Sequence, residues 1–465
     1  MQNEVIENGK FESYKKMFEA YAISPLDGRY FKNISFISEY FSEFALIKKR
    51  IFVEIQWLHF LCGEDSPIGF VLNKNIHKAL DKFHDDFSLN DFFKFKELET
   101  SLNHDVKPVE YLLRDILKNE NSEFIHFGIT SEDVTNLSYA LLFNGFKENY
   151  LMPHLENIIS SLKQLALASK TLAIPGRTHG QPATPTTLGK EFAYFVQRLQ
   201  NSYLVLKNIK IEAKFSGAVG NYAALKVAYP DLNWIDIAKN FITKFGFEIN
   251  ICTKQIEPHD WIARHCNEIQ LISTILIDLC KDIWLYGSYG YIGQKAVEGE
   301  IGSSTMPHKV NPIDFENCWG NMELTICLSQ LFSRKLPSTF LQRDLSDSTV
   351  LRNFGVLLGH FELGLYSLKK GFDRIQFNEK NAEQDLAKNT VVLAEAIQTI
   401  LRKCGVKNAY EIMKQFTRGK DVTYEQILEF IQKLDIPQDE KEKLLKLKPG
   451  DYIGESIQIV EQICK

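Results

Sequence analysis

Four segments of the chain combine small, polar and basic residues in spacings that suit chemistry on an anion. The strongest is GEIGSSTMPHKVNPIDFEN, from Gly299 to Asn317. Its glycines and serines permit a mobile loop whose backbone N–H groups can face an anion, and Lys309 and Asn311 add a positive charge and an amide. Because a long helical pattern follows, we expect an anion-binding loop at this point.

The second segment, PGRTHGQPATPTTLGKE, places His179 between prolines and directly before another helical pattern. A histidine on a rigid turn is a candidate proton carrier, because the imidazole titrates near neutral pH. Histidines on surface turns are more often structural, so the residue types alone leave both interpretations open.

The third candidate consists of two short motifs, NHD and TSED. NHD supplies Asn103, His104 and Asp105, and TSED supplies Thr130 and Ser131. Hydroxyl residues followed by two acidic residues are typical of the N-terminus of a helix, where they cap free backbone N–H groups. A structural role is therefore the stronger interpretation for Thr130 and Ser131 when they are taken alone.

The fourth segment, LQRDLSDSTVLRN, contains Arg343, Ser348 and Arg352. Ser348 and Arg352 are four residues apart, which places them on one face if the segment is helical. Two arginines and a serine can bind a phosphate or a carboxylate, or they can form surface ion pairs.

Long helices are expected to position these segments. The chain has 14 prolines, and none falls within 186–229, 259–306 or 338–436. Proline breaks helix interiors, so these intervals leave room for long helices. Apolar residues recur at steps of three and four over 188–209 and 262–283, and few stretches alternate with a period of two. We therefore predict an all-α protein with a long-helix bundle.

Apolar residues on several sides of these helices favour packing between subunits, and a monomer that satisfies them within one chain is the alternative. The division that we expect has three parts. They are an N-terminal helical domain at 1–110, a central long-helix bundle at 111–365 and a C-terminal helical domain at 366–465.

Composition excludes several classes of protein. Lys and Arg number 54 and Asp and Glu number 59, so the net charge of −5 offers no general polycation to nucleic acid or anionic lipid. An anionic substrate must then be held by a local cluster of basic groups. No apolar run approaches the ~20 residues of a membrane helix, and the start lacks the apolar core of a secretory signal. We expect a cytoplasmic protein.

The cysteines and histidines give no indication of a metal or a cofactor. The chain has 8 cysteines, and no two of them have the close spacing of a zinc or redox pair. The 11 histidines include no HxxxH pair that could bind a metal from one helix face. Buried reduced thiols are the expected state.

Taken together, the motifs resemble the fumarase/aspartase superfamily, whose members cleave C–N or C–O bonds and release fumarate. GSSTMPHKVNP closely resembles the signature loop of that superfamily. Within it, the chain resembles the adenylosuccinate lyase family in a series of motifs that run in order from residue 24 to residue 353: SPLDGRY, NHD, TSED, RTHGQPATP, QIEPHD and RDLSDSTVLRN. TRGK and YIGES extend the likeness almost to the C-terminus.

The resemblance implies a homotetramer whose core is formed by the central helices and whose sites are shared between subunits. It also implies β-elimination of fumarate from adenylosuccinate, which gives AMP, and from succinyl-aminoimidazole carboxamide ribotide (SAICAR), which gives AICAR. The partners implied are thus a small purine nucleotide substrate and further copies of the chain, with no cofactor, metal, nucleic acid or membrane.

The resemblance assigns catalytic roles to a few residues. Ser303 would be the general base, activated by Lys309 and backbone N–H groups of the signature loop. His179 would be the general acid that protonates the departing purine nitrogen, and Glu316 would orient it. His104 would support the substrate near the reacting centre.

The remaining motif residues would bind substrate. The phosphate and purine end would be held by Arg29, Tyr30, Arg343, Ser348 and Arg352. The succinyl carboxylates would be held by Thr130, Ser131, Gln255, Lys309 and Asn311. Further binding residues are expected at Asn103, Asp105 and Asn317.

Three alternatives stay open at this point. Another fumarate-releasing enzyme, such as an argininosuccinate lyase, would share the signature loop. A structural protein on a retired lyase scaffold would have no reason to keep Ser303, His179, Lys309 and Glu316 together. A regulatory protein would bind AMP without forming product.

Overall fold

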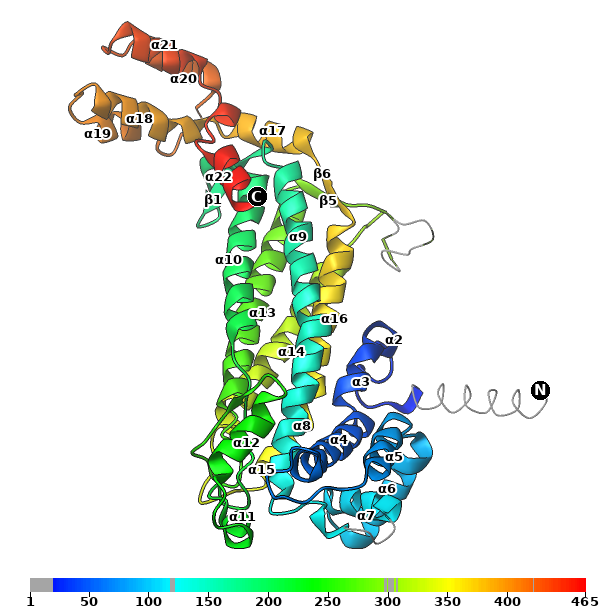
Figure 1. The fold of residues 1–465 in the computed structure, drawn as a ribbon. Helices are drawn as coiled ribbons and strands as arrows, with labels where there is room; N and C mark the ends of the chain where they lie inside the picture. The colour runs from blue at the N-terminus through cyan, green and yellow to red at the C-terminus, as the bar shows by residue number, and fades with distance from the viewer. Residues whose placement is uncertain (1–19, 118–121, 297–298, 300–304, 307, 421) are drawn as a thin grey trace. The chain divides into compact units, whose positions relative to one another are not determined.

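The computed structural model describes residues 20–117, 122–296, 299, 305–306, 308–420 and 422–465 (Figure 1). Regular structure in these residues is almost entirely helical, and the strands are six short ones in three two-stranded sheets. This confirms the predicted all-α class. No helix of the described part of the chain is long and apolar enough to span a membrane.

The chain packs as two compact units. Unit 1 comprises the described residues up to His154 together with Tyr203–Thr274 and Asn321–Gly364, and unit 2 comprises Leu155–Ser202, Ile275–Gly320 and Leu365–Lys465. The three-domain division expected from the sequence is a different division and stays a prediction.

The division between the units falls within five helices: α9 (Met152–Ala168), α10 (Leu188–Asn208), α13 (Asp260–Ser288), α14 (Ile313–Lys335) and α16 (Phe354–Phe372). The periodic positions of two of these helices are buried as their spacing predicts. On α13 they run from Ile262 to Ile283, and on α10 Leu188, Phe192 and Leu199 are each at most 1% exposed.

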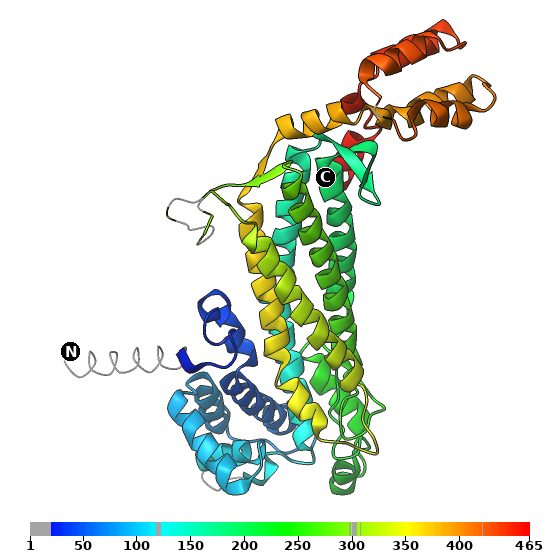
Figure 2. The same ribbon diagram turned by 180° about the vertical axis from the view of Figure 1, so that it is seen from behind.

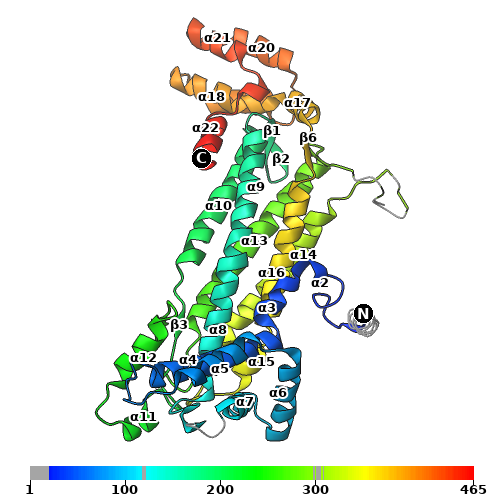
Figure 3. The ribbon, with the colours of Figure 1, turned by 45° about the vertical axis from the view of Figure 1, so that its right-hand side comes forward.

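Unit 1 contains α4 (Glu43–Cys62), which packs against α8 (Ser131–Phe146; Figure 3). Apolar side chains cover α4 on several sides, and Trp57 donates its indole N–H to the Phe127 carbonyl at 3.1 Å. Its other helices are α2 (Phe31–Ile34), α3 (Ser38–Phe41), α5 (Lys74–Asp85), α6 (Leu89–Leu102), α7 (Lys107–Leu117), α11 (Ala223–Ala228), α12 (Trp234–Thr243) and α15 (Ser346–Leu351). The parallel pair β3 (Glu212–Ala213) and β4 (Glu248–Ile249) completes it.

Unit 2 contains two antiparallel pairs, β1 (Ala173–Thr178) with β2 (Gln181–Thr187) and β5 (Ile292–Gln294) with β6 (Ile375–Phe377). The helices that follow β6, coloured yellow-orange to red in Figure 2, are α17 (Glu379–Lys388), α18 (Ala394–Lys403), α19 (Ala409–Thr417), α20 (Tyr424–Gln432), α21 (Gln438–Lys446) and α22 (Ser456–Ile463). A small apolar core that includes Ile397, Met413 and Ile431 joins α18 to α21.

Candidate active site

Unit 1 has a cavity of about 1110 Å³ that gathers residues of four predicted motifs, NHD, TSED, QIEPHD and RDLSDSTVLRN. Nine of the predicted residues line it, and they come from segments far apart in the sequence: Asn103, His104, Asp105, Thr130, Ser131, Gln255, Arg343, Ser348 and Arg352. We call this space the unit 1 cavity. Motifs that are far apart in the sequence are therefore close together in the folded chain.

The NHD motif enters the cavity where α6 ends. Asn103 takes the left-handed conformation with φ 50°, which stops the helix after Leu102. His104 then turns back, and its Nδ1 accepts the backbone N–H groups of Val106 and Lys107 at 3.1 Å each. An imidazole nitrogen that accepts hydrogen bonds carries no proton, so the ring proton of His104 lies on Nε2 and is available to a ligand.

Asp105 holds two arginines together. Its carboxylate accepts from Arg50 at 3.1 Å and from Arg352 at 3.0 Å, and its carbonyl accepts from Arg50 at 2.9 Å. Burial raises the pKa of Asp105, but the charges and hydrogen bonds of the two arginines outweigh that effect and leave the pKa below its ordinary value. The carboxylate is therefore ionised, and it fixes Arg352 at the cavity.

Most of the LSDSTVLRN segment is helical, so Ser348 and Arg352 lie on one face. It forms α15, and Arg352 at its C-terminal end donates through Nη1 to the Ser348 hydroxyl. Arg343 precedes the helix and lies 3.3 Å from carboxylate oxygens of both Glu132 and Asp347. The two predicted arginines thus reach the cavity from opposite ends of one short segment.

The TSED motif begins α8, with Thr130 at the N-cap position. The Thr130 backbone N–H donates to the Asp133 carboxylate at 2.8 Å. Asp133 is fully buried, lies 3.0 Å from the Lys214 ammonium and accepts the N–H groups of Ser216 and Gly217. This network fixes the helix start, while Thr130 and Ser131 themselves line the cavity.

Gln255 reaches the cavity from the segment before α13. Its side-chain amide donates to the Ala218 carbonyl at 3.2 Å, which leaves the amide oxygen for another partner.

The charge of the cavity wall is locally positive. Four basic side chains line it, namely Arg50, Lys96, Arg343 and Arg352, against the two carboxylates of Glu99 and Asp105. A chain with a net charge of −5 thus gathers basic groups at one site, which suits an anionic ligand.

Sequence reasoning missed several cavity residues, among them Arg50, Tyr139 and Lys96. Arg50 is 2% exposed on α4, Tyr139 is 6% exposed on α8, and Lys96 lies on α6. Burial raises the pKa of Tyr139 to about 12, so it faces the cavity as a neutral phenol. A charged residue in an apolar helical stripe was the available signal for Arg50.

Arg29 and Tyr30 belong to unit 1 but do not line the unit 1 cavity. Arg29 is exposed, and its guanidinium lies over the Tyr30 ring at 5.6 Å from the centroid.

His179 belongs to unit 2, where it forms the tip of the β1–β2 hairpin. His179 and Gly180 are the two loop residues, and both have positive φ, 53° and 74°. Two successive positive φ values give the tight turn that fits the twist of a hairpin. His179 is exposed, and among the described residues it has no hydrogen bond or ion pair.

The signature segment is described in part. Ser303 lies outside the described residues. Lys309 is exposed, and Glu316 and Asn317 are exposed on the first turns of α14. Asn311 is half-buried just before that helix. Within the described chain, Glu316 forms no hydrogen bond or ion pair with His179, although both belong to unit 2.

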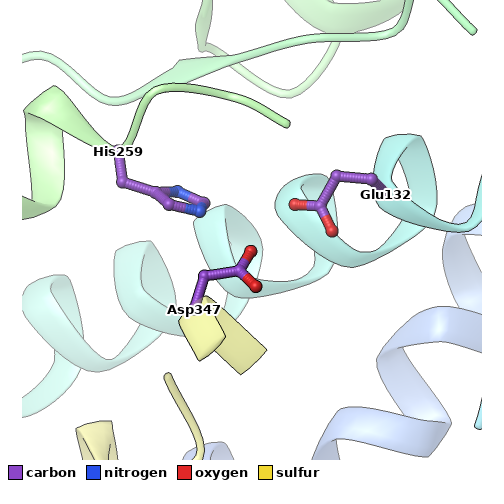
Figure 4. Close-up of side chains that lie close together, drawn as sticks. All are labelled: Glu132, His259 and Asp347. Carbon is purple, nitrogen blue, oxygen red and sulfur yellow. The ribbon is translucent and has the colours of Figure 1, made fainter. Parts of the chain in front are cut away.

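One group of described side chains has the donor types of a metal site. Ligand-capable atoms of Glu132, His259 and Asp347 lie within 4.8 Å of one another, and all three residues are buried (Figure 4). The Arg343 guanidinium already contacts both carboxylates. The expectation that the protein works without a metal or another cofactor stays a prediction.

Known proteins resemble this chain over nearly its whole length. The family model described as Lyase matches residues 28–325, and the model described as Adenylosuccinate lyase C-terminal matches residues 339–453. An adenylosuccinate lyase of Haemophilus influenzae is 44% identical over 95% of this chain and 98% of that protein. Those of Escherichia coli K12 and Dictyostelium discoideum are 41% and 44% identical, over 95% and 93% of this chain and 98% and 96% of those proteins.

Solved structures share the fold at lower identity. A 3-carboxy-cis,cis-muconate lactonizing enzyme from Pseudomonas putida has a TM-score of 0.73 at 18% identity, and it covers 97% of this chain and 98% of its own. A fumarate lyase from Mesorhizobium sp. BNC1 has a TM-score of 0.75 at 17% identity, over 92% and 97% of the two chains. Because the sequence matches cover both the motifs and the cavity residues, the chain belongs to the adenylosuccinate lyase family of the fumarase/aspartase superfamily.

Proposed function

We propose that this protein is a carbon–nitrogen lyase that cleaves adenylosuccinate to AMP and fumarate. The observation that carries the proposal is the unit 1 cavity, which brings Arg343, Ser348 and Arg352 to one wall and the hydroxyls of Thr130 and Ser131 to the same space. Guanidinium groups with a hydroxyl suit a phosphate, and short hydroxyl side chains suit a carboxylate. Adenylosuccinate carries both kinds of anion.

The proposed elimination begins with removal of a proton beside a succinyl carboxylate. Ser303 takes that proton, and Lys309 with backbone N–H groups stabilises its alkoxide. The electron pair moves to form the double bond of fumarate as the C–N bond breaks, and His179 gives its proton to the departing purine nitrogen. Hydrogen-bond donors around the carboxylate stabilise the carbanion-like intermediate.

The substrate-binding roles follow the chemistry of each side chain. We assign the phosphate and purine end to Arg343, Ser348 and Arg352, with His104 donating from Nε2. The succinyl carboxylates would be held by Thr130, Ser131, Gln255, Lys309 and Asn311. Arg29, Tyr30, Asn103, Asp105 and Asn317 complete the proposed set, and for Asp105 the contacts of its carboxylate favour a role in orienting Arg352.

The proposal includes a homotetramer with sites shared between subunits. Within the described chain His179 and Glu316 are exposed and unpaired with each other, and Arg29 does not line the unit 1 cavity, so we assign their partners in the proposed mechanism to another copy. Exposed apolar side chains on the long helices support contact between copies: Tyr194, Leu204 and Val205 on α10, Leu271 and Trp284 on α13, and Leu324 and Leu331 on α14. Burying such groups stabilises assembly.

The proposal extends to the second reaction expected of the family, the release of fumarate from SAICAR to give AICAR in purine nucleotide synthesis. Both substrates present a succinyl group on nitrogen and a ribose phosphate, so one cavity suits both. The cytoplasm is the proposed location.

An absorbance assay with the purified protein separates this proposal from its rivals. Adenylosuccinate should be converted and argininosuccinate should not. Cleavage of argininosuccinate alone would identify a different lyase. Binding of AMP without turnover of any succinyl substrate would favour a regulatory protein, and neither binding nor turnover would favour a retired scaffold.

A further inference from the structure

A buried ionisable cluster lies behind the wall of the unit 1 cavity. Glu132, His259 and Asp347 are 1%, 2% and 1% exposed, and Figure 4 shows their side chains converging from α8, the segment before α13 and α15. None of the three lines the cavity, and none has a role in the proposed elimination. Burying several ionisable groups together is costly, so their arrangement calls for a compensating interaction.

Arg343 connects this cluster to the cavity. Its Nη2 lies 3.3 Å from Glu132 Oε2 and 3.3 Å from Asp347 Oδ2. Its Nη1 forms no hydrogen bond within the described chain, and the residue lines the cavity. A guanidinium is planar and rigid, so two carboxylates at one nitrogen restrict the orientation of the whole group.

The second oxygen of each carboxylate differs in its surroundings. Asp347 Oδ1 accepts the Ser348 backbone N–H at 2.8 Å, which ties the carboxylate to the start of α15. Glu132 Oε1 is buried and has no hydrogen-bond partner. Glu132 is therefore held mainly by the charges beside it rather than by a complete set of hydrogen bonds.

His259 supplies the balancing charge. Its backbone N–H donates to Glu257 Oε2 at 2.7 Å, and its Nδ1 lies 3.3 Å from the same oxygen. Burial lowers the pKa of His259, but Glu257, Glu132 and Asp347 outweigh burial and raise it above its ordinary value. An imidazolium in this place pairs with Glu257 and adds positive charge within 4.8 Å of Glu132 and Asp347.

The same donor types would suit a divalent metal, but the position of Arg343 argues against one. A cation held by Glu132 and Asp347 would lie next to a guanidinium that already contacts both carboxylates. Two like charges at that distance repel strongly in a buried site. The geometry favours Arg343 as the cation that the two carboxylates hold.

We propose that Glu132 and Asp347, with His259 as a nearby cation, are positioning residues that hold Arg343 in place for the phosphate of the nucleotide. The inference rests on the proposed function, because it assigns Arg343 to the phosphate end of adenylosuccinate. Glu132 and Asp347 touch no substrate and act only through the arginine.

Two nearly isosteric variants, Glu132→Gln and Asp347→Asn, test the proposal. Each removes one charge-assisted contact to Arg343, and we expect the KM for adenylosuccinate and the Kd for AMP to rise about tenfold, while kcat changes less than about twofold. Inhibition by fumarate, which lacks the phosphate, should stay unchanged. The measurements are steady-state kinetics and calorimetric titration of AMP at pH 8, where the Glu132 carboxylate is charged.

Glu362→Gln is the matched control. Glu362 is also buried in unit 1, 2% exposed, and pairs with a histidine, His154, at 2.6 Å, but it does not line the cavity or contact Arg343. It should leave the AMP affinity at the wild-type value. If the Kd for AMP rises as much in Glu362→Gln as in Glu132→Gln, the effect is a general one of losing a buried carboxylate, and the proposal is overturned.

The proposal also fails if AMP affinity is unchanged in a folded Glu132→Gln or Asp347→Asn protein. Either variant suffices if the other does not fold, as judged by its thermal unfolding. Elemental analysis that finds a stoichiometric metal in the wild type, lost in His259→Asn, would replace the proposal with a metal site. A wild type that binds AMP but does not cleave adenylosuccinate would refute the proposed function alone.

Discussion

At the scale of single residues, the arginines of the site are held in place by carboxylates of the same chain. Arg352 is held by Asp105, and Arg343 is held by Glu132 and Asp347. A guanidinium that is fixed before the ligand arrives loses less conformational entropy on binding than a free one. The basic groups of the cavity are therefore oriented by the chain itself.

Glu132 should make the stability of the protein depend on pH. Burial raises the pKa of Glu132 from 4.5 to about 7, against the lowering effect of Arg343 and His259. Between these pH values the folded state holds a proton that the unfolded state has lost, so the free energy of unfolding falls as pH rises. Glu132→Gln has no carboxyl group to titrate at this position. Its free energy of unfolding, measured relative to that of wild type, should therefore rise by about 1–3 kcal/mol from pH 5 to pH 8.

Urea unfolding of both proteins at the two pH values measures this gain. Glu411→Gln, at an exposed position of α19, serves as the control for the loss of one carboxylate. If the free energy of unfolding of Glu132→Gln, relative to wild type, falls from pH 5 to pH 8, the raised pKa of Glu132 is contradicted.

His179 should matter to rate far more than to folding. It is exposed at a hairpin tip and has no partner in the described chain, so His179→Ala removes no internal contact. As the general acid, its loss should lower kcat about 10²-fold or more, with little change in the temperature of unfolding. If His179→Ala keeps the wild-type kcat at all pH values, His179 is not the general acid.

At the scale of elements, the long helices could be predicted and the hairpin could not. Steps of three and four mark α10 and α13, because their buried faces are continuous. The β1–β2 hairpin contains Pro175, Pro182 and Pro185, and its residues do not alternate between apolar and polar. A sequence of that kind indicates only an irregular turn, and the pairing that forms the strands is not a local signal.

The hairpin turn gives a prediction about one glycine. Gly180 has φ 74°, and a Cβ added there would meet no atom within 4 Å. Gly180→Ala therefore introduces backbone strain of about 1–2 kcal/mol without a clash, and it should displace His179 next to it. We expect kcat to fall about tenfold or more, measured with saturating adenylosuccinate.

Gly405→Ala is the control for that variant. Gly405 has φ 75° and equally open surroundings, and it lies in unit 2 between α18 and α19. It should lose similar stability in thermal unfolding and keep the wild-type kcat. Equal kcat for the two variants would show that the turn at Gly180 does not position a catalytic group.

Site residues that belong to short sequence motifs could be predicted. Contacts between residues from separate parts of the chain could not. NHD, TSED and the Arg343–Arg352 segment were recognisable, and the structure places them in one cavity. The ion pair of Arg50 with Asp105 and the approach of His259 to Glu132 and Asp347 were not predicted, because these groups come from separate parts of the chain. A buried charge is recognised only when the group that neutralises it is known.

At the scale of the whole molecule, we propose that each active site combines residues from more than one chain. The cavity residues lie in unit 1, the exposed His179 and Glu316 lie in unit 2, and exposed apolar side chains occur along the long helices. An enzyme whose sites combine residues from several copies is active only as an assembly. Its activity should fall when dilution separates the subunits.

Mixing two inactive variants tests the shared site. His179→Ala and Ser303→Ala each lack one proposed catalytic group, but a mixed tetramer contains sites that take both intact groups from different subunits. With random mixing, about a quarter of the sites are intact, so about a quarter of wild-type activity should return. Activity that stays at the level of the separate variants after subunit exchange would place both groups on one chain.

The most direct measurement of the central claim follows fumarate and AMP together from adenylosuccinate, for the wild type and for Ser303→Ala. We expect the wild type to release the two products in equal amounts. Ser303→Ala should bind adenylosuccinate with wild-type affinity and release neither product. A wild type that leaves adenylosuccinate intact, or a Ser303→Ala protein that keeps most of the activity, would contradict the account.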